Sequence, residues 1–304
     1  MKTADRLRVA SLQYELRPVQ SFDEFAQQAS DWVKNAADYK SQLVLFPEYF
    51  SLQLLGLEDP AKPLPELIRA VSRHLDPAIQ LFGELARRHQ ITIVAGTFPA
   101  RGPGDLITND CHVFSPQGGH GAQSKLHMTR FEKEDFKVSA PVQPKLKIFE
   151  SAWGRFAVAV CYDVEFPELV RAAALQDARM ILVPSCTDDR QSYYRVRYCA
   201  QARTIENQIF VVQSSTVGGL SRFPAACLNY GQAAILTPSD YGFSRDGILA
   251  EGVANQESMI VGDLDFKTLA DSRAEGTVLP LQDSQTTGDL SKRVEVVQIG
   301  RAHV

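Results

Sequence analysis

The 304-residue sequence contains no apolar run that approaches the roughly 18 uninterrupted residues of a membrane span. Its first residues, MKTADRLR, mix charges into the start of the chain and lack the apolar segment of a secretory signal. Runs of lysine and arginine are also missing, and the formal net charge is −4, which argues against a nucleic-acid partner. We therefore expect a cytoplasmic protein that acts on a small molecule and binds neither membrane nor nucleic acid.

Paired cysteines are missing as well. The cysteines are odd in number, widely spaced and without a CxxC pair: Cys111, Cys161, Cys186, Cys199 and Cys227. This pattern argues against a disulfide framework and against a thiolate zinc site. We therefore expect free thiols.

No linker rich in proline, glycine or serine divides the chain, and no internal repeat or low-complexity tract is present. A single domain is therefore predicted over residues 1–270. The stretch 271–304 has weak hydrophobic periodicity and includes a segment rich in Ser, Thr and Gln at 283–289. We expect it to be a tail that packs on the domain or on a neighbouring subunit.

Short apolar runs rich in β-branched and aromatic residues are typical of buried strands. Such runs cover Leu7–Leu12, Leu43–Phe46, Ile91–Phe98, Cys111–Phe114, Phe156–Cys161, Met180–Val183, Ile209–Gln213, Gln232–Leu236 and Met259–Leu264. Turn signals at Pro116–Gly119 and Ser151–Gly154 predict that the strands in the middle of the chain form antiparallel hairpins.

Helical patterns lie between several of these runs. Ser21, with Glu24 three residues later, forms a capping box before an amphipathic stretch and predicts a helix over Phe22–Tyr39. The other predicted helices run from Asp76–Pro77 to Arg88, from Pro167 onward, and over Gln191–Asn207. Strands that alternate with helices indicate an α/β protein, and the hairpins make its sheet a mixed one.

The segment from Phe156 to Glu168 runs from a buried strand through Cys161 into a helix that begins with Pro167. A thiol at the end of a strand and facing a helix start has partly exposed, electropositive surroundings, which favour the thiolate. Backbone N–H groups there can bind a developing oxyanion. Alternatively, Cys161 is a small buried apolar side chain.

Two further segments carry groups of catalytic type. Glu48 follows a buried strand directly after Pro47, at the edge where α/β sheets place their sites, and can act as a general base there. Lys125 lies at the end of a hairpin strand, where its ammonium could hold an anionic intermediate. Taken singly, Glu48 is better explained as a solvent-facing loop glutamate, and a single lysine indicates little because lysines are common.

Together these segments resemble the nitrilase superfamily of carbon–nitrogen hydrolases, whose members carry a Glu–Lys–Cys triad in this chain order. The resemblance extends over about residues 7–268. The motifs that carry it are Phe46-Pro47-Glu48, Ser124-Lys125-Leu126-His127, Cys161-Tyr162-Asp163-Val164-Glu165-Phe166-Pro167-Glu168 and Arg203-Thr204-Ile205-Glu206-Asn207-Gln208. Within the superfamily, Phe50–Leu55 and Cys199–Arg203 resemble a bacterial branch of uncharacterised predicted amidohydrolases.

The resemblance implies a four-layer αββα sandwich and a homodimer or higher homo-oligomer. It also implies roles for the triad, with Cys161 as the nucleophile, Glu48 as the general base and Lys125 as the clamp on the oxyanion. The backbone N–H of Tyr162 would be a second oxyanion donor. Such an enzyme requires neither a metal nor another cofactor.

The family often adds a second glutamate shortly after the lysine, and Glu132 is the first choice for this role, with Glu134 as the close alternative. By family position, the pocket residues are Tyr162, Ser185, Cys186, Thr187 and Asp188. Asp163 and Glu165 are interpreted as helix-start or salt-bridge carboxylates. His127 is interpreted as a structural residue near the site.

The expected reaction is hydrolysis of a non-peptide C–N bond in a small amide, which releases ammonia or an amine. Tyr162 follows the cysteine as in the amidase-like branches, whereas nitrile-cleaving members commonly have tryptophan there. Nitrile hydrolysis on the same triad remains an alternative. Alternatives of another class are an N-acyltransferase and a catalytically idle binding protein.

Overall fold

The computed structural model describes residues 4–223, 226–297 and 299. Within them, a 12-stranded sheet has the main strand order β5-β4-β3-β2-β1-β9-β8-β7-β6. Its strands are β1 (Arg6–Leu16), β2 (Leu43–Phe46), β3 (Thr92–Arg101), β4 (Ile107–Phe114), β5 (His120–Ser124), β6 (Ile148–Ser151), β7 (Gly154–Val158), β8 (Ala178–Ser185), β9 (Phe210–Gly218), β10 (Ala234–Leu236), β11 (Ile248–Glu251) and β12 (Ser258–Asp265).

The sheet is mixed, as predicted. Strands β3, β2, β1, β9, β8 and β7 are parallel to their neighbours in this series. The hairpins β4–β5 and β6–β7 pair antiparallel at the two edges. Strand β1 joins the two halves, because its first residues pair with β2 and β12 whereas its last residues, Gln13–Leu16, pair with β9.

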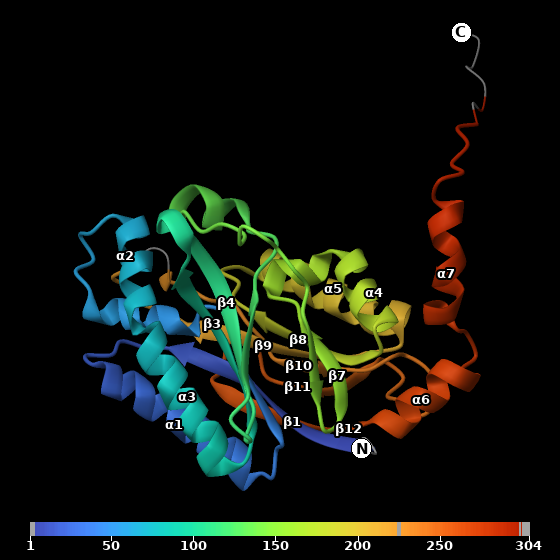
Figure 1. The fold of residues 1–304 in the computed structure, drawn as a ribbon, viewed down its shortest axis with the longest axis horizontal. Coiled ribbons are helices and arrows are strands. Elements are labelled where there is room, and N and C mark those ends of the chain that lie inside the picture. The colour runs from blue at the N-terminus through green and yellow to red at the C-terminus, as the bar shows by residue number, and fades with distance from the viewer. Residues whose placement is uncertain (1–3, 224–225, 298, 300–304) are drawn as a thin grey trace.

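The two halves of the sheet pack face to face, which gives four layers. Leu43 and Leu45 of β2 belong to the same hydrophobic core as Val158 of β7 and Leu182 of β8. Val44 and Phe46, which alternate with them along β2, belong to the core on the other face, where the Phe46 ring packs against that of Phe82. Figure 1 shows α1 and α3 outside one half and α4 and α5 outside the other. The predicted αββα sandwich is confirmed.

The helices are α1 (Phe22–Asp38), α2 (Leu64–Val71), α3 (Leu75–His89), α4 (Pro167–Leu175), α5 (Arg190–Asn207), α6 (Phe266–Glu275) and α7 (Pro280–Leu290). The hydroxyl of Ser21 caps α1 by accepting a hydrogen bond from the Glu24 N–H. The Glu24 carboxylate accepts from the N–H of Gln20 rather than from that of Ser21, so the capping box is shifted by one residue. None of these helices is both long and apolar enough to cross a bilayer.

The C-terminal stretch, expected to be a tail that packs on the domain or on a neighbouring subunit, contains the end of α6 and all of α7. The expected boundary at residue 270 falls inside α6, whose Leu269 and Ser272 are buried. The segment 283–289 lies in α7, which has no buried residue. In Figure 1, α7 extends away from the body of the molecule.

The candidate catalytic segments all follow strands that end on the same side of the sheet, which we call its carboxyl edge. Parallel strands present their carboxyl ends together, and Glu48 follows β2 while Cys161 follows β7. Lys125 follows β5, which runs antiparallel to β4 and so ends at the same edge. The fold therefore gathers three segments that are far apart in the sequence.

A bulge in β3 positions the segment that carries Glu48. The pairing of β3 with β4 shifts register between Val94 and Thr97, around Gly96, which has a φ of +48°. Thr97 accepts a hydrogen bond from the Tyr49 N–H through its Oγ1 atom, at 2.9 Å. A Cβ atom on Gly96 would lie 2.0 Å from the carbonyl oxygen of Pro47, so only glycine allows this approach.

Replacing Gly96 with alanine should therefore lower the free energy of unfolding by at least about 2 kcal/mol, because both the positive φ and the clash oppose the side chain. Gly104 provides a matched control, since it has a φ of +63° but no atom within 4 Å of the place that a Cβ atom would occupy. Gly104→Ala should cost only about 1 kcal/mol. Urea denaturation measures both, and equal losses would contradict the role of the close approach.

Candidate active site

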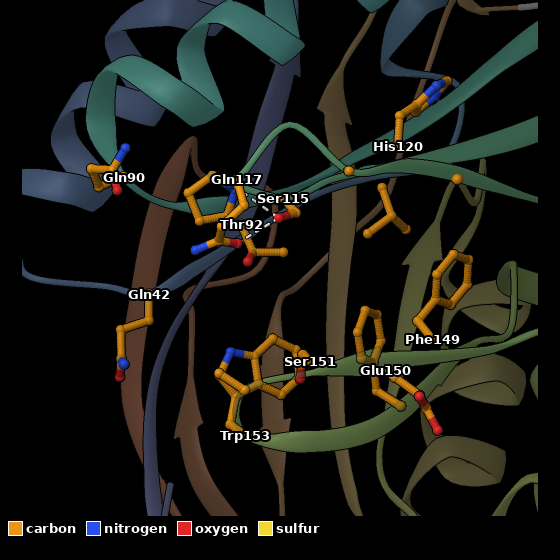
Figure 2. A pocket seen from close by; sticks show the side chains of 16 residues that line it. Gln42, Gln90, Thr92, Ser115, Gln117, His120, Phe149, Glu150, Ser151 and Trp153 are labelled. Atoms are coloured by element: carbon orange, nitrogen blue, oxygen red, sulfur yellow. Dashed lines mark hydrogen bonds between the residues drawn. The ribbon is translucent and has the colours of Figure 1, made fainter. Parts of the chain in front are cut away.

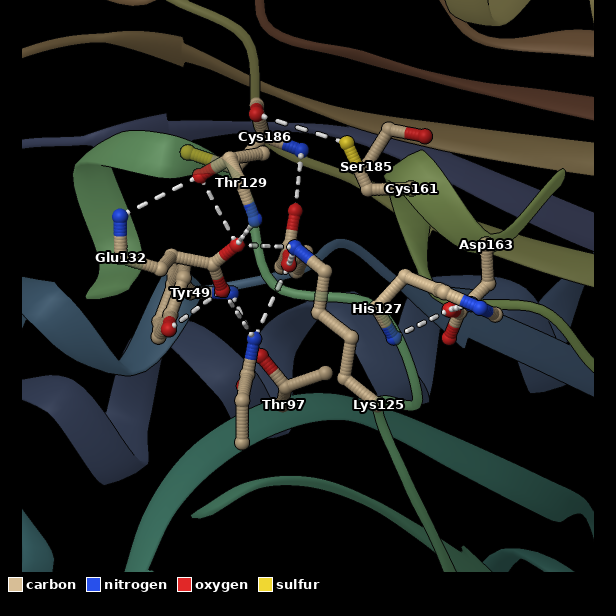
Figure 3. Close-up of polar contacts among 12 residues, drawn as sticks. Tyr49, Thr97, Lys125, His127, Thr129, Glu132, Cys161, Asp163, Ser185 and Cys186 are labelled. Atoms are coloured by element: carbon tan, nitrogen blue, oxygen red, sulfur yellow. Dashed lines mark hydrogen bonds and ion pairs between the residues drawn. The ribbon is translucent and has the colours of Figure 1, made fainter. Parts of the chain in front are cut away.

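Four buried side chains come together at the carboxyl edge of the sheet (Figure 3). Glu48 follows β2, Lys125 follows β5, Glu132 begins a short helical turn at Glu132–Phe136, and Cys161 begins another at Cys161–Glu165. None of the four is more than 4% exposed. The structure thus brings together the three residues of the proposed triad and one of the two candidate second glutamates.

The Lys125 ammonium lies between two carboxylates. Its Nζ atom is 2.7 Å from Glu48 Oε1 and 2.6 Å from Glu132 Oε2. Burial alone would lower the pKa of Lys125, but the charges of Glu132 and Glu48 outweigh burial and hold this pKa well above its usual value. Lys125 is therefore a permanent cation at the centre of the site.

Glu132 holds its negative charge firmly. Its carboxylate accepts hydrogen bonds from the Tyr49 hydroxyl at 2.8 Å, from the Thr129 N–H at 2.8 Å and from the Thr129 hydroxyl at 3.0 Å. Burial raises the pKa of Glu132, but Lys125 and these donors more than offset it, so the pKa lies below its ordinary value. Glu132 therefore remains a carboxylate beside the lysine.

Glu48 is held less firmly as an anion. Burial raises its pKa to about 7, with a further increase from the charge of Glu132 that Lys125 only partly offsets. Its Oε2 atom accepts a hydrogen bond from the Cys186 N–H at 3.1 Å. The two glutamates therefore have different proton affinities, and Glu48 is the one that can gain and lose a proton near neutral pH.

Cys161 lies at the start of its turn in a left-handed backbone conformation, with a φ of +47°. Its Sγ atom is 3.7 Å from the carbonyl oxygen of Cys186, so the backbone of Cys186 contacts both Cys161 and Glu48. Burial, followed by the charge of Glu48, raises the pKa of the Cys161 thiol well above its usual value. The thiol is neutral at rest and needs a base to become a nucleophile.

Asp163 ties the lysine segment to the cysteine turn. Its carboxylate accepts hydrogen bonds from the N–H groups of Leu126 and His127, at 3.0 and 2.8 Å, and lies 3.0 Å from His127 Nδ1. The predicted structural roles of Asp163 and His127 match these contacts. Arg203 fixes the other end of the turn, because its guanidinium donates to the carbonyl oxygens of Val164 and Glu165, each at 3.0 Å.

The remaining predicted site residues are spread from the buried site to the surface. Ser185 is buried, and Tyr162 is half-buried with its ring 5.0 Å from that of Phe166. The Cys186 thiol donates to Asn229, and the Thr187 hydroxyl donates to the carbonyl oxygen of Tyr230 at 2.6 Å. Asp188 is exposed.

Glu134, the other candidate for the second glutamate, lies outside the cluster. Its side chain is 56% exposed and pairs with Arg130 on the surface. A further sequence signal that favours Glu132 is the capping box that it forms with Thr129. The Thr129 hydroxyl accepts from the Glu132 N–H while the Glu132 carboxylate accepts from the Thr129 N–H.

Two other side chains that donate hydrogen bonds to the buried glutamates were not predicted from the sequence. Tyr49 directly follows Glu48, but nothing in the sequence indicates that its hydroxyl turns toward Glu132. Asn109 donates to both glutamates and lies in β4, whose predicted span began only at Cys111. Neither residue belongs to a recognisable sequence pattern, so the structure alone identifies them.

A hollow of about 850 Å³ opens at the other end of the sheet, near the amino ends of β2 and β3. Trp153 and Phe149 lie on one side of it and Thr92 and Ser115 on the other (Figure 2). None of the four clustered residues lines this hollow. The hollow is therefore separate from the four-residue cluster.

Glu132→Gln should lower the free energy of unfolding by about 3 kcal/mol, because it removes one partner of a buried ion pair. Glu134→Gln is the matched control and should leave stability nearly unchanged, since exposed ion pairs contribute little. Urea denaturation of both variants at pH 7 tests this difference. A Glu132→Gln variant as stable as Glu134→Gln would show that the buried pair does not depend on Glu132.

Comparison with known proteins identifies relatives of the whole fold. Residues 8–274 match the carbon–nitrogen hydrolase family. The probable hydrolase YhcX of Bacillus subtilis is 39% identical over 282 residues, which are 93% of this chain and 54% of that protein. The chain thus spans about half the length of this relative. The human omega-amidase NIT2 is 23% identical over 274 residues, 88% of this chain and 92% of that protein.

Solved structures agree with the observed layers. Nit3 of Saccharomyces cerevisiae, a member of the nitrilase superfamily, superposes with a TM-score of 0.71 at 23% identity, covering 90% of this chain and 94% of that chain. An amidase from Nesterenkonia sp. AN1 superposes with a TM-score of 0.69 at 21% identity, covering 94% and 96%. Because the family match extends over nearly all of the sheet and its flanking helices, this chain belongs to the carbon–nitrogen hydrolase family.

Proposed function

We propose that this chain is a thiol-dependent amidase, which hydrolyses the C–N bond of a small non-peptide amide and releases ammonia or an amine. The observation that carries the proposal is the buried cluster itself. A neutral thiol at Cys161 lies in one site with Glu48, a carboxylate whose pKa is about 7, and with the fixed cation of Lys125. These are the nucleophile, base and electrostatic clamp that acyl transfer requires.

The first half of the reaction forms a thioester. Glu48 accepts the thiol proton as the sulfur of Cys161 bonds to the amide carbon, and the carbonyl π electrons move onto oxygen. The Lys125 ammonium and the Tyr162 backbone N–H stabilise this oxyanion, and each such donor contributes about 10²–10³ in rate. The protonated Glu48 then transfers its proton to the leaving nitrogen as the C–N bond breaks.

The second half regenerates the enzyme. Glu48 removes a proton from water as the water oxygen attacks the thioester carbon, which forms a second oxyanion beside Lys125. This intermediate collapses with cleavage of the C–S bond, and Glu48 returns its proton to the sulfur of Cys161. The products are a carboxylic acid and ammonia or an amine, and no redox change occurs.

Relatives support the substrate class. The amidase from Nesterenkonia sp. AN1 has been captured with the acetamide moiety of fluoroacetamide on its active-site cysteine, in a variant form. The matched NIT2 proteins are named omega-amidases. Small aliphatic amides and ω-amides are therefore the first substrates to test.

The direct test is an assay of ammonia release from small amides, ω-amides, carbamoyl amines and nitriles. Cys161→Ala and Glu48→Gln should each lower turnover by at least about 10³-fold, because each removes a group that the first bond-forming step needs. Cys199→Ala, on the outer helix α5, is the cysteine control and should retain wild-type turnover. Mass spectrometry should detect an acyl adduct on Cys161 in the wild-type protein.

Other results would assign a different activity. Ammonia from nitriles but from none of the amides would favour nitrile hydrolysis, and acyl transfer to added amines without hydrolysis would favour an N-acyltransferase. Absence of both turnover and adduct would favour a binding role. Turnover that survives Cys161→Ala would eliminate the thioester mechanism.

The pH dependence gives a second test. Glu48 acts as a base only when ionised, and its pKa is raised from 4.5 to about 7. Below pH 7 the value of kcat/KM should therefore fall about tenfold per pH unit, and it should level off above pH 7. Glu134→Gln should show the same profile as the wild-type protein. An acid limb near pH 4.5 in the wild-type protein would show that the pKa of Glu48 is not raised in the working enzyme.

A further inference from the structure

One side chain contacts both carboxylates of the cluster and has no part in the chemistry described above. Asn109, which is fully buried in β4, donates from its Nδ2 atom to Glu48 Oε1 at 2.9 Å and to Glu132 Oε1 at 3.3 Å. Its backbone carbonyl oxygen accepts the Lys125 N–H at 2.8 Å. A single residue therefore contacts all three charged members of the site.

We propose that Asn109 is a positioning residue that holds Glu48 in its ionised, proton-accepting form by sharing its amide N–H groups between the two glutamates. The inference rests on the proposed function, because it concerns the base of that reaction. It assigns Asn109 a role that lies outside the Glu–Lys–Cys triad and outside the second glutamate.

Charge balance explains why such a donor is needed. Glu48 and Glu132 share one cation, Lys125, so the cluster carries one negative charge more than it can pair. Two carboxylates that approach the same donor repel each other, and this repulsion favours the protonated form of the more weakly held one, Glu48. Hydrogen bonds donated to a carboxylate oppose that effect, because they stabilise the anion.

The surroundings also fix the orientation of the Asn109 amide. Asn109 Oδ1 is buried and has no hydrogen-bond partner among the described residues. Rotating the amide by 180° would place this oxygen against carboxylate oxygens and remove both hydrogen bonds. In this orientation the Oδ1 acceptor is left unsatisfied while the Nδ2 group faces both glutamates. A buried acceptor without a partner costs free energy, so the two hydrogen bonds to the glutamates are what stabilise this orientation.

The side chain can be altered without removing the backbone contact. The hydrogen bond from the Lys125 N–H goes to the main chain of Asn109 and persists in any side-chain variant that folds. Asn109→Leu removes both amide donors with little change in volume. Asn109→Asp keeps the shape, removes the donors and adds a third acidic group beside Glu48.

The experiment measures the rate at which iodoacetamide alkylates Cys161 between pH 5 and 9, followed by peptide mass spectrometry. This readout needs no knowledge of the substrate. The wild-type rate should rise with pH through about 7, as Glu48 ionises. In Asn109→Leu the midpoint should move up by about one pH unit, which corresponds to the loss of a hydrogen bond to a charged group. Asn109→Asp should move it further.

Asn207→Leu is the matched control. Asn207 is also fully buried and donates one side-chain hydrogen bond, and its Oδ1 atom has no partner within the described part of the chain, but it lies at the end of α5. Its variant tests the general effect of replacing a buried asparagine with leucine. Its midpoint should match the wild-type value even if its melting temperature falls.

The outcomes separate this inference from the proposed function. An unchanged midpoint in both Asn109 variants, with a normal wild-type profile, would overturn the role of Asn109 and leave the amidase proposal standing. A wild-type profile that Glu48→Gln does not alter would instead remove Glu48 as the base, and with it the proposed function. If Asn109→Leu does not fold, an unchanged midpoint in Asn109→Asp still overturns the role of Asn109, because that variant loses the same amide donors.

Discussion

The placement of the Lys125 ammonium between two buried carboxylates is the constraint on which the rest of the site depends. Removing three charges from water costs several kcal/mol for each ion, and attraction alone compensates only when the remaining hydrogen-bonding positions are also filled. Tyr49, Thr129, Asn109 and the Cys186 backbone fill them. The site therefore needs polar neighbours because its three charged groups are buried.

Glu48 and Glu132 have different pKa values because they accept different numbers of hydrogen bonds. Glu132 receives donors from Tyr49 and Thr129 and stays ionised, whereas Glu48 has fewer donors and a pKa of about 7. Environment rather than residue type thus separates an electrostatic partner of the lysine from a group that exchanges protons. The same logic applies to the Cys161 thiol, which burial keeps neutral until a base acts on it.

Much of the fold was predictable because buried strands and amphipathic helices leave periodic patterns, as α1 and β2 illustrate. The three triad residues were predicted from the resemblance of their motifs to a known family. They lie close together because the strands that precede them end on the same side of the sheet. Asn109 was not predictable, since the polar start of β4 does not read as a strand. Nor was the bulge at Gly96, because a close approach between Gly96 and Pro47 depends on the spacing of neighbouring segments in three dimensions.

The strand β1, shared by the two halves of the sheet, has a consequence for how the molecule unfolds. Glu48 and Lys125 belong to the half that contains β2 and β5, and Cys161 follows β7 in the other half. Neither half keeps its buried face covered if the other detaches. Loss of docking would therefore expose core and separate the thiol from its base in one cooperative event, so the acid–base coupling of Cys161 reports the integrity of the whole sandwich.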